Sequence, residues 1–189
     1  MERYTVKDLL EARERRVEFI DSLLKRYQTP ILVMRVNYPG LRKTNDLTLT
    51  IIQEMSTLIC TMLREKVCYK TWQPGAEGPI FLAAVKEEAM ALKRITINLE
   101  EEHVLGRCLD LDVYDSLGRG ISRRELGYPR RKCYVCEEYA QHCVRSRRHG
   151  EHEVIEFIED RFERYRKWGS SNPVDAEKMG KLNVHSREE

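Results

Sequence analysis

Hydrophobic and polar residues recur along this chain with two different periods, and each period predicts a type of element. From Thr5 to about Tyr27, aliphatic residues occur at helical spacing between arginine and glutamate, which is typical of an amphipathic helix. Thr5 and Asp8 have the spacing of a capping box at its start, and Pro30 follows its end. The run Ile31–Asn37 is short, apolar and partly β-branched, so it predicts a buried strand.

The middle and the end of the chain continue this succession of helices and strands. Asn45 or Asp46 can cap a second helix, which carries apolar residues as far as Leu63. A short helix is expected at 86–93, and apolar residues from 154 to 165 indicate a final helix. Further strands are predicted at 67–72, 80–85, 95–99 and 107–114. This order predicts an α+β fold, in which a mixed or antiparallel sheet is covered by helices.

Length and composition limit the class of protein. A chain of 189 residues that is 41% hydrophobic can bury the core of one domain. We expect that domain at residues 1–169 and a flexible polar tail at residues 170–189. The charged N-terminus and the lack of a long apolar run predict a cytoplasmic protein with no membrane partner. The formal net charge of only +2 argues against nucleic acid as a partner.

Two acidic residues interrupt the apolar strand predicted at 107–114. Residues two apart on a strand face the same side, so Asp110 and Asp112 are expected on one face of the sheet. Two neighbouring carboxylates repel each other, and a Mg²⁺ ion that also binds substrate phosphates would remove that conflict. The pattern therefore predicts a site for phosphoryl or nucleotidyl transfer, and a solvated polar face on an edge strand is the alternative.

Basic residues begin this strand and follow it. Guanidinium groups bind phosphate oxygens in pairs, and lysine adds a point charge. We therefore expect the group to bind phosphates, although any single member can instead be a surface charge that pairs with a glutamate. The group consists of Arg107, Arg119, Arg123, Arg124, Arg131 and Lys132.

Four residues further along have the spacing of metal ligands. Cys133, Cys136, Cys143 and His149 form a C-x2-C-x6-C-x5-H pattern. Thiolate and imidazole groups at such intervals can complete a tetrahedral structural Zn²⁺ site. His142 competes with His149 for the fourth position, and reduced thiols without a metal are the alternative.

These motifs lie in one continuous run, HVLGRCLDLDVYDSLGRGISRRELGYPRRKCYVCEEYAQHCVRSRRH, from His103 to His149. It resembles the signature region of the holo-citrate lyase synthase family, the apo-citrate lyase phosphoribosyl-dephospho-coenzyme A transferases. Gly-Arg, Asp-x-Asp-Val, Ser-Arg-Arg and Cys-x2-Cys-x6-Cys occur in that order. The resemblance extends more weakly upstream to about Leu9. Val104 and Cys108 depart from the family pattern, and neither is an expected ligand.

The resemblance implies an activity. The family transfers a phosphoribosyl-dephospho-coenzyme A group from triphosphoribosyl-dephospho-coenzyme A to a serine on the apo acyl carrier subunit of citrate lyase, and diphosphate leaves. The paired aspartates also resemble the motif of nucleotidyltransferases. A nucleotidyltransferase-like fold is therefore expected, with a cysteine-containing basic loop before the C-terminal helix.

Roles for individual residues follow from this resemblance and from the motifs. The expected ligands of Mg²⁺ are Asp110, Asp112 and Glu100, and His103 is a candidate base. Arg13 and Arg16 on the first helix can contribute to a basic face for the carrier protein. The residues expected to bind the anionic donor are Arg107, Ser122, Arg123, Arg124, Arg131, Lys132 and Lys43.

Two other functions are considered. One is a zinc-dependent module that binds nucleic acid or protein without catalysis, which predicts stoichiometric zinc and an affinity for nucleic acid that falls with salt. The other is a nucleotidyltransferase that uses a simple nucleoside triphosphate as its donor.

Overall fold

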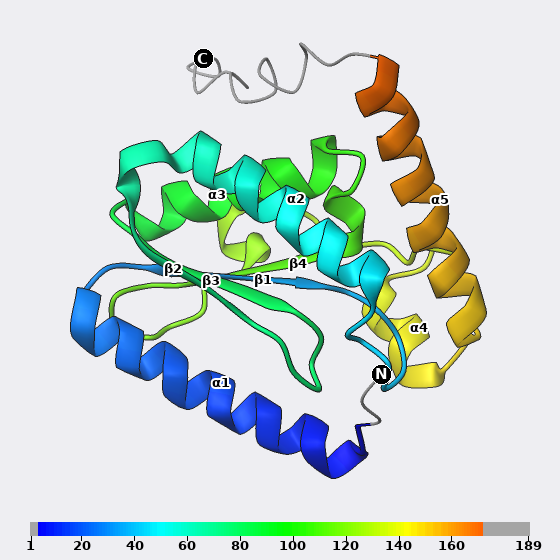
Figure 1. Ribbon diagram of the computed structural model, residues 1–189, viewed down its shortest axis with the longest axis horizontal. Coiled ribbons are helices and arrows are strands. Elements are labelled where there is room, and N and C mark those ends of the chain that lie inside the picture. The colour runs from blue at the N-terminus through cyan, green and yellow to red at the C-terminus, as the bar shows by residue number, and fades with distance from the viewer. Residues whose placement is uncertain (1–3, 172–189) are drawn as a thin grey trace.

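A four-stranded antiparallel sheet forms the centre of the protein in the computed structural model, which describes residues 4–171 (Figure 1). Its strands follow the order β2-β3-β1-β4. They are β1 (Ile31–Val36), β2 (Val67–Gln73), β3 (Ile80–Val85) and β4 (Leu109–Tyr114). The predicted α+β class with an antiparallel sheet is confirmed.

Helices cover both faces of this sheet (Figure 1). Helix α1 (Val6–Tyr27) lies on one face, and α2 (Asp46–Leu63) and α3 (Ala89–Glu102) lie on the other. Helix α5 (Glu151–Ser171) stands at the side of these layers, with the short α4 (Ala140–Ser146) near its start.

Local sequence explains where the first two helices begin. The backbone N–H of Thr5 donates to Oδ2 of Asp8 at 2.6 Å, which confirms the capping box that starts α1. Asn45, rather than Asp46, caps α2, because its Oδ1 accepts the N–H of Thr48 at 3.0 Å. Both caps satisfy N–H groups that have no partner within the helix.

The strand predicted at 95–99 is wrong, because this segment belongs to α3. The carboxylate of Glu88 accepts the N–H groups of Met90 and Ala91 at 2.9 and 2.6 Å and so starts the helix. Leu92, Thr96 and Leu99 are then buried at helical spacing. A five-residue alternation is too short to separate the two periods, and burial against the sheet decides between them. The predicted short helix at 86–93 is therefore the beginning of a longer one, and the sheet has four strands instead of five.

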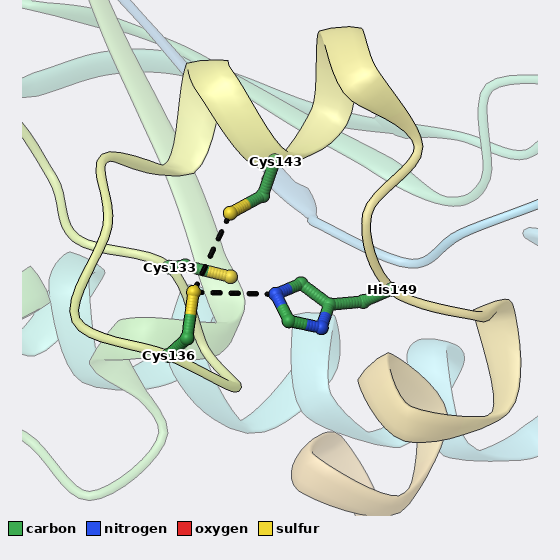
Figure 2. Close-up of side chains that lie close together, drawn as sticks. All are labelled: Cys133, Cys136, Cys143 and His149. Carbon is green, nitrogen blue, oxygen red and sulfur yellow. Dashed lines mark hydrogen bonds between the residues drawn. The ribbon is translucent and has the colours of Figure 1, made fainter.

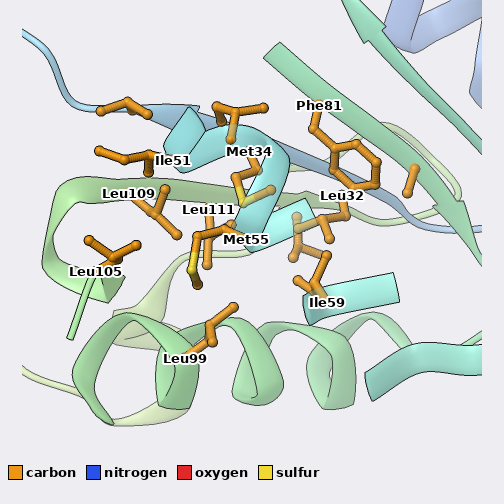
Figure 3. Close-up of a cluster of buried hydrophobic side chains, with 14 of the residues drawn as sticks. Leu32, Met34, Ile51, Met55, Ile59, Phe81, Leu99, Leu105, Leu109 and Leu111 are labelled. Carbon is orange, nitrogen blue, oxygen red and sulfur yellow. The ribbon is translucent and has the colours of Figure 1, made fainter. Parts of the chain in front are cut away.

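The hydrophobic core forms two layers, one on each face of the sheet. On the larger side, Leu32, Met34 and Leu111 of the sheet pack with Met55 of α2 and Leu99 of α3 (Figure 3). The smaller layer joins α1 to the opposite face through the buried residues Ile20, Leu23, Leu24, Ile31, Val33, Ile80, Leu82 and Ala84. Since the apolar side chains of β4 belong to the larger layer, the residues between them face the α1 side.

The last part of the chain adds two observations. Helix α5 continues through Ser171, two residues into the expected tail, and the remainder of that tail lies outside the described residues. The expected loop at 122–149 contains a 3₁₀ helix (Arg123–Leu126) and α4. Between residues 4 and 171, no helix has the length and apolar character needed to cross a membrane.

Candidate active site

Asp110 and Asp112 project from β4 toward the face that α1 covers. Their side chains are 34% and 38% exposed. Both carboxylates reach the same atom, Nη2 of Arg35 on β1, which donates to them at 2.5 and 3.1 Å. The antiparallel register places Arg35 directly opposite Asp110. The prediction that the two aspartates share one face is therefore confirmed, and a cation lies beside them.

A buried glutamate connects this pair to α1. Glu77 lies in the loop between β2 and β3 and is 5% exposed. It accepts hydrogen bonds from Nε of Arg16 at 2.8 Å and from Nη1 of Arg35 at 3.2 Å, and Nε of Arg13 lies 3.7 Å away. Carboxylate and guanidinium groups thus alternate across the space between α1 and the sheet. We call this set the α1-face site, and it consists of Asp110, Asp112, Glu77, Arg13, Arg16 and Arg35.

The cations of this site do not fully neutralise the negative charge of the aspartate pair. Burial raises the pKa of Asp112 above its ordinary value, and the neighbouring charge of Asp110 raises the pKa further. Arg35, Lys93 and Arg16 lower the pKa, but they do not offset the other two effects. The pair therefore favours an additional positive charge, which a proton or a metal ion can supply.

Lys43 adds a further cation to this side of the molecule. Burial lowers its pKa, and the charges of Arg13 and Arg35 lower the pKa further. Its ammonium group donates to the carbonyl oxygen of Tyr38. Lys43 therefore lies near Arg13, Arg35 and Glu77 of the α1-face site, and its expected role in binding the donor stays a prediction.

A groove of about 630 Å³ runs along α1 from the α1-face site. The helix contributes Arg15, Arg16 and Phe19 to its wall, and Gln73 and Glu77 line it from the end of β2 and the loop that follows. Because Arg16 and Glu77 belong both to the groove and to the α1-face site, the groove adjoins that site. Its volume is in the range of cavities that hold organic ligands.

Glu100 does not lie with the aspartates, because it covers the free edge of β4. Its Oε1 accepts the N–H of Leu111 at 3.1 Å, while Nζ of Lys93 donates to the carbonyl oxygen of Leu111 at 2.6 Å. Arg131 likewise donates to the carbonyl oxygen of Leu109 at 2.8 Å. These side chains satisfy backbone groups that an edge strand leaves without partners.

This placement differs from that expected of a third Mg²⁺ ligand beside the aspartates. Glu100 comes from α3, on the face of the sheet opposite α1, and its Oε1 is engaged by the N–H of Leu111, whereas Asp110 and Asp112 face α1 (Figure 1). Its nearest cations are Arg131 and Arg123, at 3.8 and 3.9 Å. The geometry therefore gives no support to Glu100 as a third ligand beside the aspartates, and its contacts are those of an edge cover.

His103 lies on the other side of the sheet from the aspartates. It ends α3, and its ring lies against Tyr165 of α5 with centroids 5.7 Å apart. Nδ1 accepts the N–H of Leu105 at 3.1 Å. Burial lowers the pKa of His103 to about 4, so the ring is neutral at pH 7. These contacts place it in the core between α3 and α5, away from the α1 face where a base would be needed.

Two of the expected donor-binding residues have partners in the backbone instead. Arg107 donates to the carbonyl oxygens of Lys132 and Cys133 at 2.9 and 3.3 Å, so it holds the start of the cysteine segment. The hydroxyl of Ser122 accepts the N–H of Glu125 at 3.4 Å and caps the 3₁₀ helix that follows. The structure does not bring either residue to the α1-face site.

Most of the remaining basic residues pair with glutamate, as the alternative interpretation proposed. Arg123 donates to Glu101 at 2.6 Å, and Lys132 to Glu137 at 2.5 Å. Arg119 similarly pairs with Asp115 and Glu125. Arg124 is exposed, and its side chain makes no ion pair within residues 4–171.

The sequence analysis missed Arg35, Glu77 and Lys93. Arg35 had a signal, since it is a single cation inside the otherwise apolar strand β1. Glu77 lies in a loop that separates two strands, and Lys93 lies on a helix. Nothing in the local sequence distinguishes these two residues from solvated surface charges, so their burial is known from the tertiary structure.

The cysteine segment forms a second cluster of reactive side chains. Cys133, Cys136, Cys143 and His149 point toward a common centre (Figure 2). All four bring a ligand atom within 4.8 Å of the others, and the cysteines are free. The structure selects His149 over His142, whose Nδ1 lies 3.7 Å from Glu138 outside the cluster. Burial would raise the pKa of Cys133, but N–H groups of Val135 and Cys136 that donate to its sulfur lower the pKa.

The fold and the site together define a class: an α+β protein with paired aspartates among arginines on one face of an antiparallel sheet. Comparison with known proteins narrows that class. The family model for apo-citrate lyase phosphoribosyl-dephospho-CoA transferase matches residues 4–165. The chain therefore belongs to this family.

Individual relatives agree with the family model. The chain is 35% identical over 165 residues to a probable apo-citrate lyase phosphoribosyl-dephospho-CoA transferase of Vibrio cholerae, with 82% of this chain and 90% of the relative covered. It is 32% identical over 148 residues to the transferase of that name from Citrobacter koseri, with 77% and 81% covered. A third relative of that name, from Escherichia coli, is 32% identical over 152 residues.

Proposed function

We propose that this protein transfers the phosphoribosyl-dephospho-CoA group from 2'-(5''-triphosphoribosyl)-3'-dephospho-CoA to a serine of the apo acyl carrier subunit of citrate lyase. Membership of the family and the names of its relatives support this reaction. The structural observation that carries the proposal is the convergence of Asp110 and Asp112 on Arg35 at one face of the sheet. A cytoplasmic location is part of the same proposal.

The reaction that follows from these substrates is a displacement at phosphorus. The serine oxygen forms a bond to the α-phosphorus of the triphosphate, and the bond from that phosphorus to the β-phosphate oxygen breaks. The hydroxyl loses its proton, and diphosphate leaves with the electron pair. Negative charge grows on the leaving group, so catalysis depends on positioning and on positive charge. Arg13, Arg35 and Lys43 are the side chains that we assign to this charge.

The aspartate pair suits Mg²⁺. Its carboxylates supply the hard oxygen ligands that this ion prefers, and the raised pKa of Asp112 is consistent with a need for further positive charge. We propose that Asp110 and Asp112 hold the ion, which would supply charge neutralisation to the phosphates. Arg35 now donates to both carboxylates, so a metal ion would compete with its guanidinium group.

Glu77 is the acidic residue that we assign to positioning at this site. It is buried and bonds Arg16 and Arg35 at once, so it sets where the guanidinium of Arg35 meets the aspartates. We extend the proposal to a nucleotidyltransferase-like fold. Nucleotidyltransferases also carry paired aspartates on a strand, beside cations that bind phosphate. That extension is an analogy of motif and chemistry.

The groove along α1 is the space that we assign to part of the donor. It adjoins the α1-face site through Arg16 and Glu77 and is too large for a metal ion alone. Arg13 and Arg15 are 54% and 66% exposed on the same helix. They present positive charge near the site, which suits the approach of an acidic carrier protein.

An intact-mass assay tests this proposal. The protein is incubated with Mg²⁺, the triphosphoribosyl donor and apo carrier, and the carrier should gain the mass of the prosthetic group. Asp110→Asn and Asp112→Asn should each slow this labelling by about a hundredfold or more, with the far-ultraviolet circular dichroism unchanged. Asp160→Asn, on an exposed part of α5, is the matched control and should label normally. Normal labelling by both site variants would reject the α1-face site.

The other two functions make different predictions in related assays. A non-catalytic nucleic-acid module would bind labelled oligonucleotides with an affinity that falls with salt, and membership of a transferase family counts against it. A protein that used a simple nucleoside triphosphate would transfer a nucleotide to the carrier when the triphosphoribosyl donor is replaced by that triphosphate.

A further inference from the structure

We infer that Cys133, Cys136, Cys143 and His149 bind one Zn²⁺ ion in a structural site. The ligand atoms are the three sulfurs and Nε2 of His149. These residues come from the turn between Lys132 and Tyr139, from α4 and from the loop before α5, and their side chains converge (Figure 2). Every pair of ligand atoms lies within 4.8 Å. Three thiolates and one imidazole are a known ligand set for structural zinc.

Two of the separations between these ligand atoms are close to the edges of a zinc tetrahedron. Zinc–sulfur bonds of about 2.3 Å and a zinc–nitrogen bond of about 2.0 Å place sulfur atoms about 3.8 Å apart and sulfur about 3.5 Å from nitrogen. Sγ of Cys136 lies 3.5 Å from Sγ of Cys143 and 3.3 Å from Nε2 of His149. A disulfide has sulfur atoms about 2.0 Å apart, so Cys136 and Cys143 are not joined by one in this structure.

A carboxylate faces the second nitrogen of the histidine ring. Nδ1 of His149 lies 3.6 Å from Oε1 of Glu153, while Nε2 faces the sulfurs. Histidines that bind metal commonly present their other ring N–H to a carboxylate, which holds the ring in the required tautomer. The second oxygen of Glu153 accepts the N–H of Gly150 at 2.7 Å, so the carboxylate is itself held at the start of α5. Glu153 is thus a positioning residue for the fourth ligand.

The segment needs such a link, because it has little core of its own. Between residues 122 and 150, Cys143 is the one buried residue, at 5% exposed. A segment that buries so little apolar surface must offset the entropy of ordering in another way, and a bound metal can do so. The ring of Tyr134 stacks on Phe157 of α5 with centroids 4.7 Å apart, next to the cluster. The ion would therefore join the turn at Cys133 and α4 to the beginning of α5.

Metal analysis of the purified full-length protein tests this inference without any substrate. We expect one zinc per chain by mass spectrometry of the metal, and X-ray absorption that fits three sulfur ligands and one nitrogen ligand. Cys136→Ser and His149→Ala should lower the zinc content to below about a tenth of the wild-type value. Cys68→Ser and His142→Ala are matched controls, because these residues lie outside the cluster, and both should keep one zinc.

A second measurement covers variants that fail to fold. Removal of zinc from the wild-type chain with a chelator should lower its unfolding temperature and increase proteolysis between 130 and 150, and added zinc should restore both. Wild-type protein that contains no zinc and binds none on titration would overturn the inference. So would retention of zinc by a Cys136→Ser, Cys143→Ser double variant. Neither result bears on the transferase proposal, because carrier labelling is measured separately.

Discussion

Replacement of Glu100 by alanine should destabilise the protein strongly, whereas glutamine at this position should be tolerated. The side chain is 4% exposed, and its Oε1 accepts the N–H of Leu111 on the edge of the sheet. Alanine leaves that buried N–H without a partner, which costs about 1–3 kcal/mol. Alanine also leaves a cavity where the buried side chain packed, so we expect a total loss of about 3–5 kcal/mol.

This loss is large enough to measure by thermal or urea unfolding. For a chain of this size, each kcal/mol lowers the unfolding temperature by about 2–4 °C, so alanine should lower it by about 6–20 °C. Glutamine keeps an oxygen that accepts the N–H of Leu111 and loses the charge alone. Burial raises the pKa of Glu100, although Arg131 and Lys93 oppose that increase, so the charged form is not favoured by its surroundings. Glutamine should therefore lie within about 1 kcal/mol of wild type.

The same variants should then be compared in the carrier-labelling assay. Our reasoning predicts near-normal labelling for Glu100→Gln, because the carboxylate covers an edge and does not bind the reacting groups. Glu101→Gln is the matched control, since this neighbouring glutamate is more exposed and pairs with Arg123. If Glu100→Gln unfolds like wild type but loses labelling as severely as Asp112→Asn, the assignment to the edge of β4 is refuted and the carboxylate has a chemical role.

Three further predictions concern buried positions. Burial lowers the pKa of His103 from 6.5 to about 4, so the unfolded chain binds the proton more tightly than the folded protein. The free energy of unfolding should therefore fall by about 2 kcal/mol as pH decreases from 7.5 to 5. His103→Gln should flatten this part of the pH profile of urea unfolding, and parallel profiles for variant and wild type would contradict the prediction. A Cβ at Gly106 would lie 2.1 Å from the carbonyl oxygen of Leu99. Gly106→Ala should therefore lower the free energy of unfolding by about 3 kcal/mol or more, and a urea midpoint equal to that of wild type would disprove the contact. Glu77→Gln should lower the free energy of urea unfolding by about 3–5 kcal/mol, because three arginines lose a buried counter-charge. An unchanged urea midpoint would show that solvent balances the charge of these arginines.

Local sequence was sufficient for several elements and for one part of the site. The capping box of α1 and the cap of α2 are made by residues three apart, so their geometry is set within one helical turn. The two aspartates share a face because side chains alternate along any strand. The spacing of Cys133, Cys136 and Cys143 similarly identified residues that the fold brings together.

Other features depend on contacts between distant parts of the chain. The segment 95–99 has a pattern that suits a strand or a helix, and packing of its buried side chains against the sheet makes it a helix. The position of Glu100 shortly before the aspartates in the sequence suggested a shared site. However, β4 is an edge strand, and its free N–H at Leu111 binds the carboxylate of Glu100.

The partner of the aspartates is the clearest example of this difference. Arg35 is 75 residues from Asp110 along the chain, and the two meet because β1 and β4 are adjacent and antiparallel in this register. Periodicity determines which residues point the same way, since it follows from backbone geometry over a few residues. Strand order and helix packing decide which of those faces meet, because they depend on burial of apolar surface across the whole domain.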